Sequence, residues 1–433
     1  MFQAAVNAWK IADLRKKILF TLLIIVIYRL GSAIPVPFIE ADAMKLIFAV
    51  DSGSLGSGNS MFSFLNIMAG GSLEKATIFA LAISPYITAS IVIQLLTVAI
   101  PALERMQKEG EEGRKKLAQI TRYTTVVLAL IEGYGYYSVL LHSAKDLGTT
   151  VIANPHWFKT LIIVLTFTAG SSIVMWLGEK INENGIGNGI SIILFFSIVS
   201  RGPSVIAYMY SYGVELGQYW VIPLVLVVFL ALIVFIIIMN DAERRIPIQY
   251  AKRVVGRKMY GGQNTHLPIK VTMTGVLPII FASSFCMLPT TIAQFFPNSG
   301  FANFMTKYFS YTTWPYAVVY FLLILFFNYF YVTIQYNPIE IANNVKKNGG
   351  FIPGIRPGKP TSDFISKVLS KTTLLGALFL GFIAILPILI SMGLKVNIAL
   401  GGTSILIIVG VILETLKQIE SQMLMRHYKG FLE

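Results

Sequence analysis

Residues 218–239 read QYWVIPLVLVVFLALIVFIIIM and contain no Asp, Glu, Lys or Arg. A helix needs about 20 apolar residues to cross the hydrocarbon core of a bilayer, which is about 30 Å thick. The run ends at Asn240, and the segment that follows, 241–270, is rich in Lys and Arg. This boundary predicts a membrane-spanning helix that leaves the bilayer on the cytoplasmic side.

The same alternation of apolar runs and short charged segments extends along the whole chain. Hydrophobic residues make up 55% of the 433 residues and charged residues only 13%, which is too few charges to cover a soluble protein of this size. The pattern predicts an all-α polytopic membrane protein with about ten spans. They are expected near 17–35, 76–98, 120–140, 157–177, 188–206, 218–239, 270–292, 314–334, 373–393 and 402–419.

The net charge of +14 is distributed unevenly between the segments that connect these spans. Ten spans place four basic segments on one face, namely the residues before span one, 102–122, 241–270 and 336–372. The segment 36–75, on the opposite face, has four acidic residues and two lysines. Because cytoplasmic loops carry the excess of Lys and Arg, we expect both termini in the cytoplasm.

The ten expected spans fall into two groups of five. The natural seam is the external stretch around 207–217, so the halves are 1–206 and 207–433. An odd number of spans in each half requires the two halves to have opposite orientations. This count predicts an inverted repeat, whose functional path runs between the halves.

The segment 51–75 contains a polar stretch, DSGSLGSGNS, followed by a short apolar stretch broken by Gly70-Gly71. The apolar part is too short to span a bilayer. A re-entrant or interfacial helix is the simpler interpretation. A stopper inside a water-filled cavity is the alternative, because irregular backbone is tolerated there at membrane depth.

Two basic loops are longer than simple connections require. The segment 241–270 alternates β-forming residues with cations and predicts a hairpin, and 336–372 predicts a short helix followed by Gly/Pro turns. Projecting basic loops suit an anionic partner such as ribosomal RNA or an acidic motor surface.

Motifs of catalysis are missing from the sequence. It contains no HExxH, no GxSxG and no complete phosphate-binding loop, so we expect no enzyme activity, no cofactor and no metal site. An ion-coupled small-solute transporter would need ionisable groups at membrane depth, where only Arg29 and Glu132 are candidates. From the residues alone, a passive channel and an ion-coupled transporter both remain open.

Five long motifs spread over the chain resemble the SecY family of protein-conducting channels. They are KEGEEGRKKLAQITRY (108–123), GEKINENGIGNGISI (178–192), THLPIKVTMTGVLPIIFASS (265–284), GGFIPGIRPG (349–358) and GGTSILIIVGVILETLKQI (401–419). The resemblance implies a gated passive channel for unfolded polypeptides in the bacterial cytoplasmic membrane. It also implies an hourglass pore between two five-helix halves.

The resemblance places a ring of apolar side chains at the waist of this pore. Such a ring dewets a narrow passage and blocks ions, yet yields around a passing peptide. The residues that match are Ile83, Ile87, Ile190, Leu194, Ile280 and Ile407.

The resemblance further implies a plug and a lateral gate. The plug is expected at about 62–73, with Phe62, Phe64, Leu65, Ile67, Met68, Gly70, Gly71 and Leu73 as its residues. The gate is expected between spans two and three on one side and seven and eight on the other. Gln94 and Thr272 are expected to form a hydrogen bond across it when it is closed.

The basic loops then become docking sites for the ribosome and for the SecA motor ATPase. The residues expected to make these contacts are Arg244, Arg245, Arg253, Arg257, Lys258 and Arg356. SecE-type and SecG-type subunits are the implied neighbours. Polypeptides that carry a signal sequence are the implied substrates, and the lipid bilayer receives their hydrophobic segments.

Overall fold

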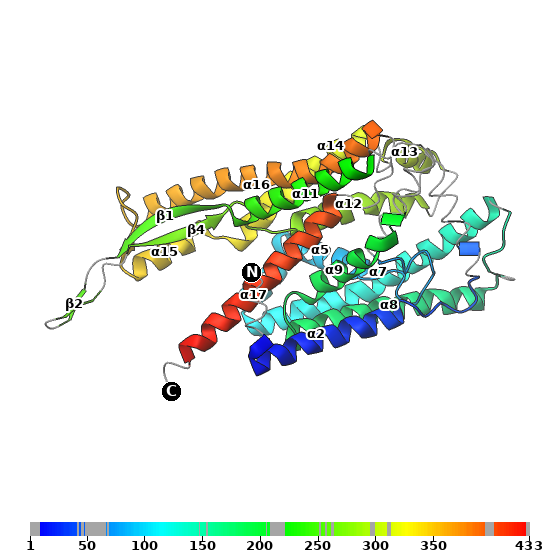
Figure 1. Ribbon diagram of the computed structural model, residues 1–433, viewed down its shortest axis with the longest axis horizontal. Helices are drawn as coiled ribbons and strands as arrows, with labels where there is room; N and C mark the ends of the chain where they lie inside the picture. Colours follow the sequence, from blue (N-terminus) through cyan, green and yellow to red (C-terminus); the bar gives the residue numbers. More distant parts are fainter. Residues whose placement is uncertain are drawn as a thin grey trace.

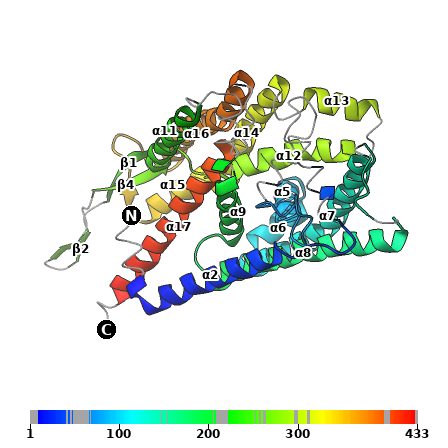
Figure 2. The ribbon, with the colours of Figure 1, turned by 45° about the vertical axis from the view of Figure 1, so that its right-hand side comes forward.

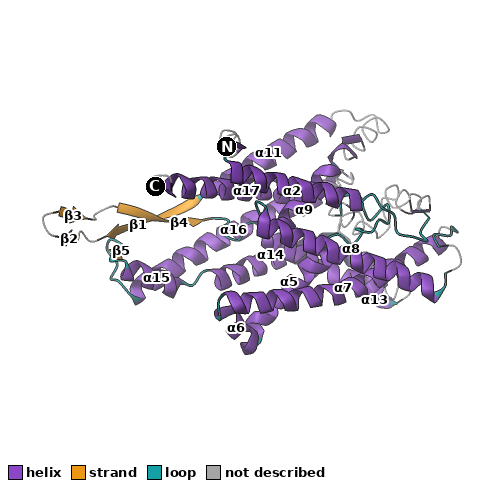
Figure 3. Ribbon diagram, turned by 90° about the horizontal axis from the view of Figure 1, so that it is seen from below, coloured by secondary structure: helices purple, strands orange, loops and turns teal. Residues whose placement is uncertain are grey.

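Long helices dominate the protein, and most of them run along its longest axis (Figure 1). The computed structural model describes residues 9–40, 43–44, 47, 66, 69–146, 148–152, 155–204, 206–207, 221–250, 253–255, 258–260, 264–294, 299–309, 313–394 and 402–429. The predicted helical class is confirmed by this architecture, with a small β-sheet at one end (Figure 3).

Each predicted span overlaps one helix of the structure. In the first half these are α2 (Ala12–Gly31), α5 (Ser84–Ala99), α7 (Glu111–Asp146), α8 (Trp157–Asn184) and α9 (Gly189–Ser200). In the second half they are α11 (Val221–Asp241), α12 (Leu277–Gln294), α14 (Trp314–Gln335), α16 (Lys359–Leu394) and α17 (Gly402–Lys429). Shorter helices are α6 (Pro101–Lys108), α13 (Gly300–Tyr308) and α15 (Pro338–Lys347).

Length and composition identify fewer spans than the sequence pattern predicts. Within the described residues, four helical stretches are long and apolar enough to cross a membrane. They are Glu111–His142 of α7, Trp157–Asn184 (α8), Trp314–Lys347 (α14 with α15) and Lys359–Ile390 of α16. The bent pair α5 and α6, with an angle of 101° between its two parts, makes a fifth if it is counted as one span. The number of ten spans therefore stays a prediction.

Two predicted spans start later than their apolar sequence does. The segment 76–98 is helical only from Ser84, because Pro85 occupies a first-turn position and Ala82, just before it, has a left-handed backbone (φ 47°). The segment 270–292 is helical only from Leu277. Gly275 precedes that helix with φ 60°, a conformation that glycine adopts without strain.

One hydrophobic core joins the two halves. Its buried side chains come from α2, α5, α8 and α9 of the first half and from α11, α12, α14, α16 and α17 of the second. A second cluster packs Ala69, Leu73 and Val36 against Tyr136 of α7 and Phe167 of α8. The first cluster therefore forms the contact between the halves, and the second fixes the segment that precedes α5.

The predicted hairpin of the basic loop is confirmed. Strand β1 (Glu243–Tyr250) pairs with β4 (Asn264–Lys270) in antiparallel register, and β5 (Gly350–Phe351) adds to the other edge of β1, so the sheet order is β4-β1-β5 (Figure 3). The tip carries the short strands β2 (Arg253–Val255) and β3 (Lys258–Tyr260). The predicted short helix of the second loop is α15, which lies beside the sheet.

Candidate functional site

The predicted ring residues all belong to the core between the halves. Ile83, Ile87, Leu194, Ile280 and Ile407 are each no more than 5% exposed, and Ile190 packs against the same cluster while partly buried. They come from the start of α5, from α9, from α12 and from α17. The structure thus gathers the six residues in one apolar region, and a ring at the waist of a pore stays a prediction.

The junction between α8 and α9 shows how local contacts orient α9 so that Ile190 and Leu194 lie in this region. The Asn188 side chain caps α9 by accepting hydrogen bonds from the backbone N–H of Ile190 (3.1 Å) and Ser191 (3.4 Å). The Gly189 N–H donates to Asn182 Oδ1 at 2.8 Å. A Cβ atom on Gly189 would overlap the Gly178 carbonyl oxygen, so the two helices approach closely only because glycine stands there.

The predicted plug residues lie only partly within the described part of the chain. Gly70, Gly71 and Leu73 are described, with positive φ at both glycines, and Tyr136 Oη donates to the Leu73 carbonyl at 2.7 Å. The remaining predicted residues, Phe62, Phe64, Leu65, Ile67 and Met68, lie outside the described residues.

A polar cluster beside Gly70-Gly71 was not predicted from the sequence, apart from Arg29. Arg201 Nη1, at the end of α9, donates to Glu74 Oε2 at 2.9 Å, and Asn66 Nδ2 donates to the same oxygen at 3.1 Å. Arg29 Nη2, in the last turn of α2, donates to the Phe196 carbonyl at 3.2 Å. Separations of 127 and 167 residues hide these pairs from sequence reasoning.

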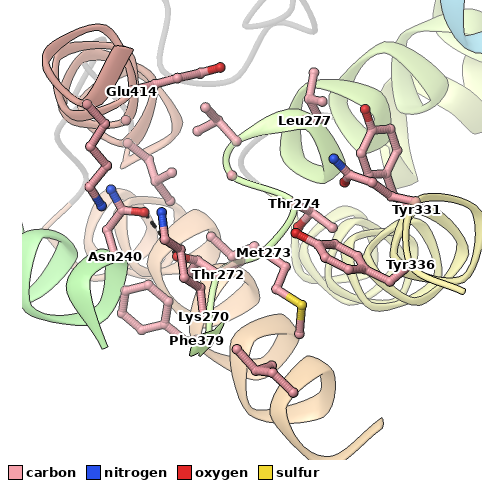
Figure 4. Close-up of a pocket in the computed structure, with 18 of the residues that line it drawn as sticks. Asn240, Lys270, Thr272, Met273, Thr274, Leu277, Tyr331, Tyr336, Phe379 and Glu414 are labelled. Carbon is pink, nitrogen blue, oxygen red and sulfur yellow. Dashed lines mark hydrogen bonds between the residues drawn. The ribbon is translucent and has the colours of Figure 1, made fainter. Parts of the chain in front are cut away.

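The predicted hydrogen bond between Gln94 and Thr272 stays a prediction. Thr272 Oγ1 has a single proton, and it donates to Asn240 Oδ1 of α11 at 3.1 Å, within the second half of the chain (Figure 4). Gln94 is half-buried on α5. The helices expected at the gate do meet, because α12 packs against α5 and α7 (Figure 2).

A cavity of about 570 Å³ lies beneath the β-sheet and reaches the predicted ring residue Ile280. Its walls come from the start of α9, from β4, from the turn before α12, and from α11, α14, α16 and α17. Polar residues of its lining include Lys270 and Lys417, and Lys417 forms an ion pair of 2.9 Å with Asp241. Burial and the neighbouring Lys417 lower the pKa of Lys270 below its ordinary value.

Five of the six predicted docking residues lie in the strands β1, β2 and β3 or in the loop after β5, at one end of the molecule (Figure 3). Arg244 and Arg356 are exposed, and Arg245 pairs with Glu243 at 2.7 Å. Arg253 is the first residue of β2 and Lys258 is the first residue of β3. Arg257 lies outside the described residues. Buried Ile246, Ile269 and Ile365 give the sheet its own small core, so the loops are folded rather than extended.

Acidic, histidine and cysteine side chains do not gather at a metal-binding spacing anywhere in the described ranges. Cys286 is a buried free cysteine. A free cysteine commonly packs in a protein core as a small hydrophobic residue.

Comparisons with known proteins identify the class of this fold. The SecY family model matches residues 77–416. Among solved structures, a protein-conducting channel superposes with a TM-score of 0.64 at 16% identity, with 94% of this chain and 92% of that chain covered. Sec61 in the canine ribosome–channel complex from the endoplasmic reticulum superposes with a TM-score of 0.60 at 15% identity, with the same coverage. The fold is therefore that of the SecY and Sec61 channels.

Sequence identity to curated relatives is much higher than to these solved structures. The protein translocase subunit SecY of Streptomyces scabiei is 47% identical over 440 residues, and that of Mycobacterium tuberculosis is 42% identical over 451 residues. Both alignments cover 100% of this chain and 100% of the relative. The chain belongs to the SecY family, whose members are multi-pass proteins of the bacterial cytoplasmic membrane.

Proposed function

We propose that this chain is a gated, passive channel that conducts unfolded polypeptides across the cytoplasmic membrane and releases hydrophobic segments sideways into lipid. The observation that supports it most directly is the full-length similarity, at 47% identity, to a protein translocase subunit SecY. The apolar core that joins the two halves, with all six predicted ring residues in or against it, fits the same function.

The mechanism follows from the chemistry of that core. Branched apolar side chains hold water out of a narrow waist, and ions then lack the ligands that would replace their hydration shell. A polypeptide passes because apolar side chains move apart without breaking specific bonds. A hydrophobic segment leaves for the lipid because each buried CH₂ group gains about 0.8 kcal/mol. The channel itself catalyses no reaction in this proposal, so a partner supplies the driving force.

The proposed topology has both termini in the cytoplasm, with the basic sheet on the same side. Leu14 of α2 and Ile419 of α17 pack in one small cluster, which supports a common side for the start of the first span and the end of the last. The excess of Lys and Arg in the loops supports the cytoplasm as that side.

The proposed division of labour has two halves, 1–206 and 207–433, with a plug near 62–73 and a gate where α12 meets α5 and α7. The solved SecY structure in which a plug domain stabilises the closed state superposes with a TM-score of 0.63 at 18% identity. That fold likeness and the buried turn at Gly70-Gly71 support the plug.

The proposed partners dock on the exposed cations of the basic loops, and Arg244, Arg245 and Arg356 are described examples. A related fold, Sec61, was solved in a ribosome–channel complex. We propose the ribosome and a SecA motor ATPase as alternating partners at this surface, with SecE-type and SecG-type subunits beside the helices. Signal-sequence-bearing polypeptides are the proposed substrates.

An ion-coupled solute transporter is not supported. The curated relatives that match the whole chain are translocase subunits. Arg29, one of the two ionisable candidates at membrane depth, donates to a backbone carbonyl beside the Gly70-Gly71 turn.

Crosslinking to a trapped substrate tests the proposed function. In a Cys286→Ser background, a single cysteine replaces Ile83 or Ile407, and membranes are loaded with a stalled secretory chain. The control cysteine replaces Leu226 of α11, whose side chain is 58% exposed. Adducts at both core positions and none at Leu226 support the channel. A demonstrably engaged chain that reacts at neither core position refutes it.

A further inference from the structure

The turn that leads into α12, residues 271–276, is fastened to three helices of its own half. Its first residue, Val271, donates its N–H to the Ala242 carbonyl at 2.9 Å, just after the end of α11. Gly376 of α16 lies so close that a Cβ atom there would overlap the Val271 carbonyl oxygen. The start of the turn is therefore held by backbone contacts on two sides.

Two side-chain hydrogen bonds hold the rest of the turn, and Figure 4 shows the one between Thr272 and Asn240. Thr272 Oγ1 donates to Asn240 Oδ1 of α11 at 3.1 Å. Thr274 Oγ1 donates to Asn328 Oδ1 of α14 at 2.6 Å, and Asn328 Nδ2 donates in turn to the Thr373 carbonyl of α16 at 3.0 Å.

Two of these polar side chains are almost completely buried in the protein. Thr274 is 4% exposed and Asn328 is 3% exposed. A buried polar group that loses its hydrogen bond costs free energy because water cannot satisfy it. The Thr274–Asn328–Thr373 network therefore favours one arrangement of the turn over others.

The turn also has the freedom to act as a pivot. Gly275 has φ 60°, and no heavy atom of the described residues outside its own neighbourhood lies within 4 Å of the position that a Cβ atom would take. Val276 and Leu277, next along the chain, line the 570 Å³ cavity. Open space on one side and hydrogen bonds on the other are what a hinge with a preferred position requires.

The helix that leaves this turn reaches the other half of the molecule. α12 packs on α14 of its own half and on α5 and α7 of the first half (Figure 2). The hydrogen bonds of the turn lie entirely in the second half. The conformation of the turn sets the orientation of α12, and this orientation determines how α12 packs against α5 and α7.

We infer that Thr272, Asn240, Thr274 and Asn328 are positioning residues that hold α12 in the orientation that closes the seam between the halves. Their role in gating rests on the proposed channel function. Asn240, which accepts from Thr272, belongs to the same half of the chain as Thr272 and not to the facing half. Loss of the network releases α12 toward orientations in which the seam opens.

A distance measurement across the seam tests this inference without any transport assay. Spin labels are placed at His142 of α7 and Ile292 of α12, both exposed, in a Cys286→Ser background in lipid nanodiscs. The test variant is Thr274→Val with Asn328→Leu, which removes both side-chain partners of the 2.6 Å bond. The variant also removes the hydrogen bond from Asn328 Nδ2 to the Thr373 carbonyl. The loss of these two hydrogen bonds is expected to raise the population of a second, displaced distance at least about fivefold.

Two matched variants distinguish a specific effect on the orientation of α12 from a general destabilisation of the protein. Thr372→Val removes a hydroxyl that donates only within α16, to the Val368 carbonyl at 2.7 Å, and should leave the distance distribution unchanged. Thr274→Ser keeps the hydroxyl and should restore the wild-type distribution. If the double variant does not fold, Thr272→Val with Asn240→Leu tests the other hydrogen bond in the same way.

A folded double variant with the wild-type distance distribution overturns the inference. Equal broadening in Thr372→Val also overturns it, because the effect would then not depend on this network. The result is independent of substrate crosslinking, so a failed translocation experiment and a failed hinge experiment are distinguishable. In parallel, ion leak through the double variant should rise about fivefold with the displaced population.

Discussion

Ile407 is the clearest single residue on which the closed state depends. Its side chain is 2% exposed within the core that joins the two halves. Replacement by Asn brings an amide into this core, and the amide has hydrogen-bonding groups that attract water. We expect Ile407→Asn to raise ion leak several-fold in planar bilayers.

The matched control for this substitution is Ile412→Asn on the same helix, where the side chain is 41% exposed. It should leave ion leak at the wild-type level. Equal leak in wild type and Ile407→Asn would remove Ile407 from the predicted ring.

The ion pair between Arg201 and Glu74 is a second prediction at the scale of single residues. The side chains are 24% and 33% exposed, so water screens the pair only partly. We expect Arg201→Gln to lower the free energy of unfolding by about 1 kcal/mol. Thermal unfolding in detergent measures the effect.

A double-mutant cycle checks that the loss comes from the pair. Glu74→Gln with Arg201→Gln should cost less than the sum of the single substitutions, because the pair can be lost only once. Strictly additive effects would show that the two side chains act separately.

At the scale of elements, the junction between α8 and α9 tests how closely the helices must approach. Gly189→Ala forces a Cβ atom against the Gly178 carbonyl oxygen, so a backbone must shift. We expect a loss of about 2 kcal/mol in the free energy of unfolding, as in other overpacked sites. Thermal unfolding again measures it.

Gly202→Ala is the control for this junction, because no heavy atom of the described residues outside its own neighbourhood lies within 4 Å of a Cβ atom there. It should be neutral or slightly stabilising. A neutral Gly189→Ala would mean that the helices separate freely at this point.

Elements were predicted well where one local signal governs them. The hairpin of β1 and β4 follows from alternating β-formers, and α15 begins at Pro338 after Asn337, whose side chain caps it by accepting from Ile339 and Glu340. The starts of α5 and α12 were misplaced. Both follow turns that contain no charged residue, and the absence of charge alone does not separate a turn from a helix inside a protein core.

At the scale of the whole molecule, the uneven net charge predicts where partners dock. Arg356 is exposed in the loop between β5 and α16, and the fold does not depend on its side chain. We expect Arg356→Glu to weaken binding of ribosomes or of the motor at least several-fold, because a repulsive charge replaces an attractive one. Cosedimentation with ribosomes measures this.

Lys307→Glu makes the same charge change on α13, at the opposite end of the molecule from the β-sheet (Figure 1). It should leave ribosome binding unchanged, and both variants should unfold at the wild-type temperature. Equal weakening by the two substitutions would mean that only the overall charge matters.

The sequence by itself determined the membrane class and the family motifs, and it predicts the side of the basic loops. These follow from local composition. A run of about 20 apolar residues is most stable in the hydrocarbon core of the bilayer, and the Lys and Arg residues beside it favour the cytoplasmic side. It also named six core residues, each within such a motif. The tertiary structure alone decided the partners of polar side chains. Thr272 bonds to Asn240, Arg201 to Glu74, and Thr274 to Asn328, across separations of 32 to 127 residues. A buried polar group takes whichever partner the packing of distant helices brings within reach, and no local pattern records that choice.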